Sequence, residues 1–534
     1  MRILDTSLTI LRRHLSRRIF TISTANLNRL INSYLTDDRL VEARSLFDQN
    51  TRSLDNATWN TMINAYVRRR RIREAHELFD QMPQRDVASW NALLMGLTET
   101  RDPERVVWFF LEMQRSGLNP DEHTISVLVN TVSGSSFKIL IEQIHALAIC
   151  SGLNLSAYAG SALLKGYSSI KNPTALQRIF DDILLKDVSS WNSLIMGYMK
   201  LGFVGKGEKA FNQMPDRNIV SFHTMIIGYI RNTMIDKARI LFDQMCERNV
   251  FSWTVMINGY VRRRKFIVAL KLFKSMVESG YRPSHYTLST VLDACSGCSL
   301  LPMGKQVHSI ITKFGMECDI VLSTSLLDMY AKSGDISAAS FVFSSMKVKN
   351  SASWNSMIGG FARHGQGTNA LEEFGKMLES GFKPDQVTFI NLLMACAHAG
   401  LVEEGEEQFS AMSKYGIAAE KEHYACMVDL YGRAGQLDKA ERLIKGMPFE
   451  PDVVIWGALL GACGLHSCLE LGEVAANGVS KLRSDHPAAY EVLLRIHGEK
   501  GVWTSVTELR KLMKQKNAKK QKAGSWVESP LDDR

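Results

Sequence analysis

Two short motifs in this chain carry residue types that bind zinc. They are His497-Gly498-Glu499 and the pair Cys295 and Cys298. A zinc-dependent base deaminase needs H-x-E followed by P-C-x-x-C, with one His and two Cys on the metal. Here no cysteine follows residue 468, and the cysteine pair lies far upstream of the histidine. We therefore interpret both motifs as structural residues, and expect no catalytic residue, no metal, no cofactor and no enzymatic activity.

A second set of polar residues recurs at regular places along the chain. Asn60, Asn91, Asn192 and Asn355 each follow a tryptophan. The Trp residues at the same place in this pattern, at 59, 90, 191, 253, 354 and 456, are separated by 31, 101, 62, 101 and 102 residues. These separations are sums of steps of 31 to 35 residues, which is the signature of a repeat protein. Residues 24–452 divide into thirteen repeats that average about 33 residues.

Each repeat contains two amphipathic stretches. VASWNALLMGL places Trp90, Leu94 and Leu97 on one helical face, and RIREAHELFDQM does the same for Ala75, Leu78, Phe79 and Met82. Longer repeats end with helix-stopping residues, which are Gly117, Gly280 and Gly381, followed by Pro120, Pro283 and Pro384. One helical hairpin cannot bury its apolar face alone, so the repeats must stack. We predict an all-α fold, an α-solenoid of helix-turn-helix repeats.

The charge of the chain is concentrated at its two ends. The net charge is +9, and both residues 1–23 and residues 510–525 are strongly basic, so the region between them is close to neutral. An apolar content of 45% excludes a wholly disordered chain, and no apolar run approaches a membrane span. The nine cysteines are dispersed and odd in number, which predicts buried thiols in a reducing compartment.

Residues 1–23 have the pattern of an organelle transit peptide. They are rich in Arg, Ser and Thr, they are poor in acids, and Leu and Ile recur at helical spacing. We favour import into the mitochondrion, with the chloroplast as the alternative. A basic first helix that is retained is a further alternative.

At this point the chain resembles the plant pentatricopeptide-repeat (PPR) family. The phrases VASWNALLMGL, LLDMYAKSGD, LFDQMPQRD and CMVDLYGRAGQLDKAERLIKGMPFEPD carry the resemblance, which covers residues 24 to about 528. The mixture of repeat lengths resembles the PLS subclass. Residues 453–486 and 487–528 resemble its two E repeats and precede a short tail, 529–534, with no DYW deaminase domain. The resemblance implies a right-handed superhelix. The tetratricopeptide pattern fits less well.

The resemblance implies that two residues of each repeat read one RNA base, at repeat position 5 and at the last position. The residues at position 5 and at the last position of the thirteen repeats, in that order within each pair, are Asn28/Asp55, Asn60/Asp86, Asn91/Asp121, Ser126/Ser156, Ser161/Asp187, Asn192/Asn218, His223/Asn249, Thr254/Ser284, Ser289/Asp319, Thr324/Asn350, Asn355/Asp385, Ile390/Glu420 and Ala425/Asp452. Helix capping is an alternative role for the last residue, because it favours the same residue types. Capping does not explain the polar residue within the first helix.

By the same resemblance, Asn/Asp prefers U, Ser/Asp prefers G, Thr/Asn prefers A, and Asn/Asn prefers a pyrimidine. The repeats that contain Ile390 and Ala425 depart from this code, and the longer repeats that begin at 122 and 285 are of a type whose code is poor. The thirteen repeats then favour the RNA sequence U-U-U-n-G-Y-n-n-n-A-U-n-n, written 5′ to 3′, where Y is a pyrimidine and n is an unassigned base. Family alignment places the last repeat four nucleotides before an edited C.

Basic residues recur at repeat position 13. They are Arg68, Lys200, Arg231, Arg262, Lys332, Arg363 and Arg433. A residue at a fixed repeat position forms a stripe along a solenoid, so these side chains could hold phosphates. The alternative is a solvated basic turn. Seven phosphate contacts would give a log–log salt slope no steeper than about −5.

These expectations describe an adaptor that binds single-stranded organellar RNA, selects sites for C-to-U editing, and recruits a DYW-type deaminase or another editing-complex protein through its E repeats. No membrane partner is expected. Two alternatives remain, an organellar factor for RNA stabilisation, splicing or translation, and a peptide-binding helical scaffold. The sequence names neither the transcript nor the partner.

Overall fold

The computed structural model describes residues 24–51, 54–99, 102–132, 137–482, 487–499, 501 and 503–515. Every regular element within these residues is a helix, as predicted. None of the helices described is long and apolar enough to cross a membrane. The predicted transit peptide, 1–23, and the tail, 529–534, lie outside the described residues.

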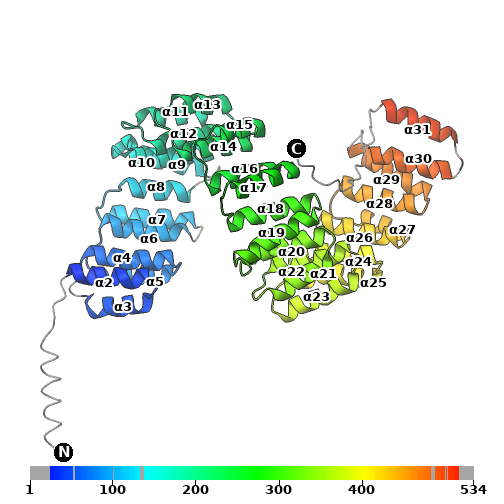
Figure 1. Cartoon of the computed structure of the whole chain (residues 1–534), viewed down its shortest axis with the longest axis horizontal. Coiled ribbons are helices and arrows are strands. Elements are labelled where there is room, and N and C mark those ends of the chain that lie inside the picture. The colour runs from blue at the N-terminus through cyan, green and yellow to red at the C-terminus, as the bar shows by residue number, and fades with distance from the viewer. Residues whose placement is uncertain are drawn as a thin grey trace, which may run out of the picture. The chain divides into compact units, whose positions relative to one another are not determined.

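The helices form two compact blocks. The N-terminal block extends to Arg248 and the C-terminal block begins at Asn249. In each block the helices stack in chain order (Figure 1). The N-terminal block contains α2 (Thr24–Thr36), α3 (Leu40–Gln49), α4 (Asn56–Arg68), α5 (Ile72–Gln81), α6 (Val87–Thr98), α7 (Pro103–Arg115), α8 (Glu122–Thr131), α9 (Lys138–Cys150), η3 (Leu153–Leu155), α10 (Ala157–Ser169), α11 (Pro173–Asp182), α12 (Val188–Lys200), α13 (Val204–Gln213), α14 (Ile219–Arg231) and α15 (Ile235–Asp243).

The C-terminal block contains α16 (Val250–Arg262), α17 (Phe266–Glu278), α18 (His285–Gly297), α19 (Leu301–Lys313), α20 (Ile320–Lys332), α21 (Ile336–Ser345), α22 (Ser351–Arg363), α23 (Gly367–Glu379), α24 (Gln386–Ala399), α25 (Val402–Ala411), η4 (Met412–Tyr415), α26 (Lys421–Arg433), α27 (Leu437–Lys445), α28 (Val453–Leu465), α29 (Leu469–Leu482), α30 (Pro487–Glu499) and α31 (Trp503–Gln515).

Each repeat is a helical hairpin whose first helix begins at the first residue of the sequence repeat. Within each block the first helix packs on its own second helix and on the first helix of the next repeat, as α10 does with α11 and α12. The predicted inward residues Trp90, Leu94 and Leu97 are buried, and so are Leu78 and Phe79 of α5. Each block is therefore a solenoid with a shared apolar core.

The turn between the two helices contains a residue in the left-handed backbone region. Gly202 has φ +84°, Thr233 has φ 68° and Arg264 has φ 55° at equivalent repeat positions. This conformation ends the first helix sharply and reverses the chain. Only glycine adopts it without steric cost, so the non-glycine repeats carry backbone strain.

The end of the second helix differs between long and short repeats. Five of the six long repeats have a 13-residue second helix followed by a left-handed glycine, such as Gly117 after α7. In the sixth, α25 has 10 residues and η4 lies between it and the left-handed Gly416. Short repeats end earlier, and a basic residue takes over the capping role. Arg217 donates from Nε to the carbonyl of Phe211 (3.0 Å) and from Nη2 to that of Asn212 (2.9 Å), while its guanidinium lies over the Phe211 ring. These bonds satisfy carbonyl groups that the helix itself leaves unpaired.

One apolar core joins the last PPR-like repeats to the helices that follow. It includes Leu393 of α24, Met427 of α26, Leu460 of α28 and Ile496 of α30. Helices α28 to α30 therefore continue the stack.

The cysteines differ from the prediction in one respect. Cys295, Cys396 and Cys463 are buried, but Cys150, Cys246 and Cys318 are exposed, because second-helix ends and loops place the latter outside the core. The prediction of uniformly buried thiols was wrong for these three.

Candidate nucleic-acid interface

The last residue of every repeat except the one that ends at Glu420 caps the helix that follows it with its side chain. Asp86, for example, accepts from the backbone N–H of Ser89 at 2.8 Å, and Ser89 Oγ in turn accepts from the backbone N–H of Asp86. The same side-chain cap is made by Asp55, Asp121, Ser156, Asp187, Asn218, Asn249, Ser284, Asp319, Asn350, Asp385 and Asp452. Capping is therefore a real function of these residues.

In four repeats the same carboxylate also accepts from the amide at repeat position 5. The donor–acceptor distances are 3.2 Å for Asn28 to Asp55, 3.2 Å for Asn60 to Asp86, 2.8 Å for Asn91 to Asp121 and 3.0 Å for Asn355 to Asp385. A carboxylate only accepts hydrogen bonds, so the NH₂ group of each amide must face it. Position 5 and the last residue thus form one oriented polar pair.

Hydrogen bonds lower the pKa of two of these carboxylates, Asp55 and Asp86. Bonds from the Thr58 hydroxyl and the Thr58 backbone N–H lower the pKa of Asp55. Burial acts to raise the pKa of Asp86, but bonds from Ser89 and the Asn60 amide outweigh it and lower the pKa overall. At neutral pH both side chains are therefore acceptors with a negative charge.

The other predicted pairs are less uniform. No direct hydrogen bond joins Ser161 to Asp187, Asn192 to Asn218, or Thr324 to Asn350 among the hydrogen bonds of the described residues, and Ser161 Oγ is buried without a partner there. Thr254 and Ser284 are linked through Thr287, whose Oγ1 lies 2.7 Å from Thr254 Oγ1 and 2.8 Å from Ser284 Oγ. His223 and Asn249 belong to different blocks.

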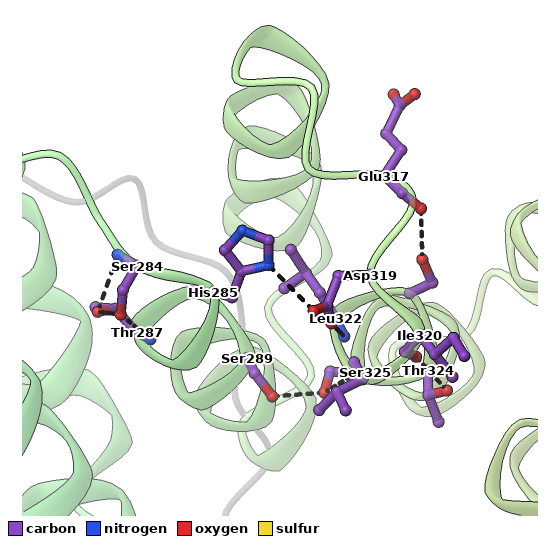
Figure 2. A network of polar contacts seen from close by, with 12 residues as sticks. Ser284, His285, Thr287, Ser289, Glu317, Asp319, Ile320, Leu322, Thr324 and Ser325 are labelled. Carbon is purple, nitrogen blue, oxygen red and sulfur yellow. Dashed lines mark hydrogen bonds and ion pairs between the residues drawn. The ribbon is translucent and has the colours of Figure 1, made fainter. Parts of the chain in front are cut away.

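A polar groove lies beside the position-5 residues of α16, α18 and α20. It has a volume of about 360 Å³ and is lined by Arg262, Tyr286, Ser289, Ser325 and Asp328, among others. Ser289 and Ser325 lie 2.7 Å apart through their hydroxyl groups (Figure 2). Figure 2 also shows His285, at position 1, directed at Asp319, the last residue of the same repeat, with a distance of 3.2 Å. The groove brings a position-5 residue, a position-13 cation and an exposed aromatic ring together.

Sequence reasoning missed a row of exposed apolar side chains at repeat position 2. Its members are Tyr158, Val220, Phe251, Tyr286, Val321, Val387 and, in α28, Val454. Each is between 49% and 66% exposed, although it lies in a helix whose other apolar residues are buried. The signal in the sequence that could have identified this row is an apolar residue that does not lie on the buried face predicted by the helical periodicity. Such a row offers flat contacts on both sides of a stacked base.

All seven predicted position-13 cations are exposed, and each ends the first helix of its repeat. Lys332 lies 2.6 Å and Arg363 3.5 Å from Asp328, and Arg433 lies 2.8 Å from Asp429. For Arg68, Lys200, Arg231 and Arg262 the described residues provide no ion pair. Burial, followed by the nearby charges of Arg231 and Lys165, lowers the pKa of Lys200. The positive charges of neighbouring repeats therefore repel one another in this part of the stripe.

The zinc-type motifs form no metal cluster in the described part of the chain. His497 Nε2 lies 3.8 Å from Glu473, and Glu499 accepts from Ser467. Cys295 and Cys298 are free, and burial raises the pKa of the Cys295 thiol to about 12. In the described structure this thiol is therefore protonated at neutral pH.

Comparison with known families matches this architecture. The PPR repeat family model matches residues 85–133, 248–297 and 349–398, and the PPR repeat model matches 57–87, 189–219, 220–250, 321–351, 387–417 and 422–450. Together these ranges cover more than half of the chain. The E motif model matches residues 466–528.

Curated relatives come from Arabidopsis thaliana. One pentatricopeptide repeat-containing protein with a mitochondrial designation is 33% identical over 502 residues, which are 94% of this chain and 64% of the relative. Another such protein is 34% identical over 447 residues, which are 84% of this chain and 61% of the relative. The chain thus spans less than two thirds of the length of these relatives.

Among solved structures, the pentatricopeptide repeat protein PPR10 from maize is similar with a TM-score of 0.48 and 19% identity, over 96% of this chain and 78% of that protein. A structure of PPR10 with an 18-nt psaJ RNA element aligns with a TM-score of 0.40 and 17% identity, over 94% of this chain and 86% of that protein. From the family models and the curated relatives, the chain belongs to the PPR repeat family and carries an E motif after its repeats.

Proposed function

We propose that this protein binds single-stranded RNA, one base per repeat, and selects organellar transcript sites for C-to-U editing. The observation that carries RNA binding is the recurring pair of a position-5 amide and a last-residue carboxylate that accepts from it, as in Asn91 and Asp121. Such a pair presents an N–H donor and an acceptor at the same place in successive repeats. Uracil carries complementary acceptors and a donor on its Watson–Crick edge, so Asn/Asp repeats suit U.

The position-2 side chains supply the second half of a base site. Packed helices lie about 8–10 Å apart. Apolar groups on neighbouring first helices then bracket a slot close to the roughly 7 Å that a flat base needs, with a contact of about 3.5 Å on each face. Phe251 and Tyr286 lie in consecutive repeats and provide aromatic surfaces of this kind. Position 2 would hold the base, while position 5 and the last residue would choose it.

The editing role rests on the E motif, residues 466–528, and on the helices at its start. Helix α28, which directly precedes the motif, and helix α29 within it expose Val454, Leu465, Val474 and Leu482, which favours contact with a protein partner. We propose that this partner is a deaminase of the DYW type or another editing-complex protein. The mitochondrial designation of two relatives supports an organellar location, with the mitochondrion favoured over the chloroplast.

The experiment is RNA binding by the purified full chain at fixed salt, with a 17-nucleotide RNA of sequence UUUnGYnnnAUnnnnnC. Ser161 should read the G at the fifth position. We expect Ser161→Asn to change the preference there from G to a pyrimidine, because the new amide would pair with Asp187 as Asn91 does with Asp121. Ser309→Asn, on the second helix α19, is the matched control and should leave the preference unchanged.

Equal binding of all RNAs, or of none, would contradict the proposal and favour a peptide-binding scaffold. Editing is then scored in plants that lack the protein, at organellar sites that match the preferred sequence. Loss at such a site is the expected result. Unchanged editing with altered RNA length profiles would instead favour an RNA-stabilising factor.

A further inference from the structure

We infer that a third residue sets how strictly an Asn/Asp repeat distinguishes uracil from cytosine, namely the Ser or Thr at position 3 of the following repeat. This inference rests on the proposed RNA binding and deepens it. As a threonine, this residue contacts the oxygen of the position-5 amide and lies beside the carboxylate that accepts from the amide NH₂ group. Its contact depends on whether it is Thr or Ser.

A threonine at this place clamps the amide. Thr124 Oγ1 lies 2.7 Å from Asn91 Oδ1, while Asn91 Nδ2 donates to Asp121 at 2.8 Å. The repeat of Asn355 has the same geometry with Thr388, at 2.7 Å and 3.0 Å. Thr58 makes the corresponding contact with Asn28. In these three repeats both ends of the amide are held.

A serine at this place turns away from the amide. Ser89 Oγ donates to the backbone carbonyl of Asp86 at 2.7 Å, while Asn60 Nδ2 still donates to the Asp86 carboxylate. Asn60 Oδ1 is buried and has no hydrogen-bond partner among the described residues. For Asn192, the residue at position 3 of the following repeat is Ser221. Asn192 Oδ1 is likewise buried and has no hydrogen-bond partner among the described residues. These amides are not held on the acceptor side.

The two arrangements differ in the number of hydrogen bonds that must break before the amide can bind cytosine instead of uracil. A clamped amide offers the base only an N–H donor, which suits the carbonyl groups of uracil and opposes the amino group of cytosine. To present its oxygen to cytosine, Asn91 must give up two hydrogen bonds, whereas Asn60 gives up one and also relieves an unpaired buried acceptor. We therefore expect a Thr-clamped repeat to be strict for U and a Ser-followed repeat to accept C more readily.

The test measures the ratio of dissociation constants for C and U at two positions of the RNA. Position 2 is read by Asn60 and position 3 by Asn91. For the wild-type full chain, the ratio should be about fivefold larger at position 3, as expected for one additional hydrogen bond. Ser89→Thr should raise the ratio at position 2 by about the same factor, and Thr124→Ser should lower it at position 3.

Ser190→Thr is the matched control. It makes the same change at the same helix position, and Ser190 Oγ also donates to the cap carbonyl, at 2.8 Å. The repeat that precedes Ser190 has Ser161 at position 5, so there is no amide for the new threonine to contact. The ratio of dissociation constants at RNA position 2 should therefore stay unchanged. Thr388→Ser, tested at position 11, repeats the measurement in the C-terminal block and guards against misfolding of one variant.

The outcomes separate this inference from the proposed function. If the wild type prefers U over C at both positions and neither exchange alters the ratios, the inference is wrong and the RNA-binding proposal stands. If the wild type binds RNA without any preference, or does not bind it, both fail. Reciprocal changes in Ser89→Thr and Thr124→Ser would support both.

Discussion

At the scale of single residues, the side chain that ends a repeat caps a helix and also takes part in the RNA recognition that we propose. Asp121 accepts from the backbone of Thr124 at the start of α8 and from the amide of Asn91 on α6. The two roles that the sequence left as alternatives are thus compatible. Loss of this carboxylate would remove a cap and leave an amide donor unpaired at once.

Two half-buried histidines give the fold a pH dependence. His145 Nδ1 lies 3.0 Å from the Tyr167 hydroxyl, and His308 Nδ1 lies 2.9 Å from that of Tyr330. Burial lowers the pKa of both histidines from the ordinary value of 6.5. The folded state therefore binds fewer protons than the unfolded chain, so stability is complete above about pH 6.5 and falls as the pH drops below it.

We expect the unfolding temperature of the wild type to fall between pH 7.5 and pH 5.5. The double variant His145→Gln, His308→Gln keeps a hydrogen-bonding side chain but removes the titration, so its fall should be smaller. Carboxylates with lowered pKa, such as Asp55, lose their contribution only at lower pH. Circular dichroism melts at the two pH values measure the difference, and equal falls would contradict this account.

At the scale of elements, the turn within each hairpin is the strained part of the repeat. The chain reverses between the two helices at the second residue after the first helix, which adopts a positive φ in the repeats of Gly202 and Thr233. Gly202 provides this without cost, whereas Thr233 adopts φ 68° with a branched side chain. The strain is offset by the packing of the two helices that the turn connects.

Thr233→Gly should therefore stabilise the N-terminal block by about 1 kcal/mol, because it removes a left-handed β-branched residue. Its side chain is exposed, so no packing is lost. Gly202→Thr is the reverse change in the preceding repeat and should destabilise by a similar amount. Urea unfolding of both variants measures the shifts, and a shift of the same sign in both would refute the explanation.

At the scale of the molecule, the cations available to RNA are set by local acids rather than by net charge. The region between the basic ends is close to neutral. Asp328 lies beside both Lys332 and Arg363, whereas Arg262 lines the groove with no ion pair in the described residues. The phosphate-contact stripe that we propose is therefore stronger in some repeats than in others.

Salt dependence of RNA binding measures this stripe. Each phosphate contact contributes about 0.7 to the log–log slope for a single strand. Arg262→Ala should make the slope shallower by about that amount, whereas Asp328→Asn should make it steeper by releasing two cations. Binding is titrated between low and moderate salt, with Arg73→Ala on the second helix α5 as the control. Identical slopes in all variants would favour the solvated-turn alternative.

The sequence predicts the repeat organisation well and the contacts around the readers poorly. The Trp90 pattern and its spacing give the helix starts, because apolar periodicity is a local signal. The exposure of Tyr286 was recoverable from the same pattern, but was missed. The clamp of Thr124 on Asn91, the basic caps such as Arg217, and the groove beside Ser289 join residues of different helices. Spacing alone does not predict such contacts.

The set formed by Asn91, Asp121 and Thr124 crosses the junction between two repeats. A single repeat that is transplanted as residues 87–121 therefore lacks Thr124, the third residue of the set that we propose reads the base. Recombination that replaces one repeat would also supply a new third residue to the repeat before it, and so would alter the stringency of a position that was not exchanged. Engineers who assemble such arrays should take the first turn of the following helix along with each transplanted repeat.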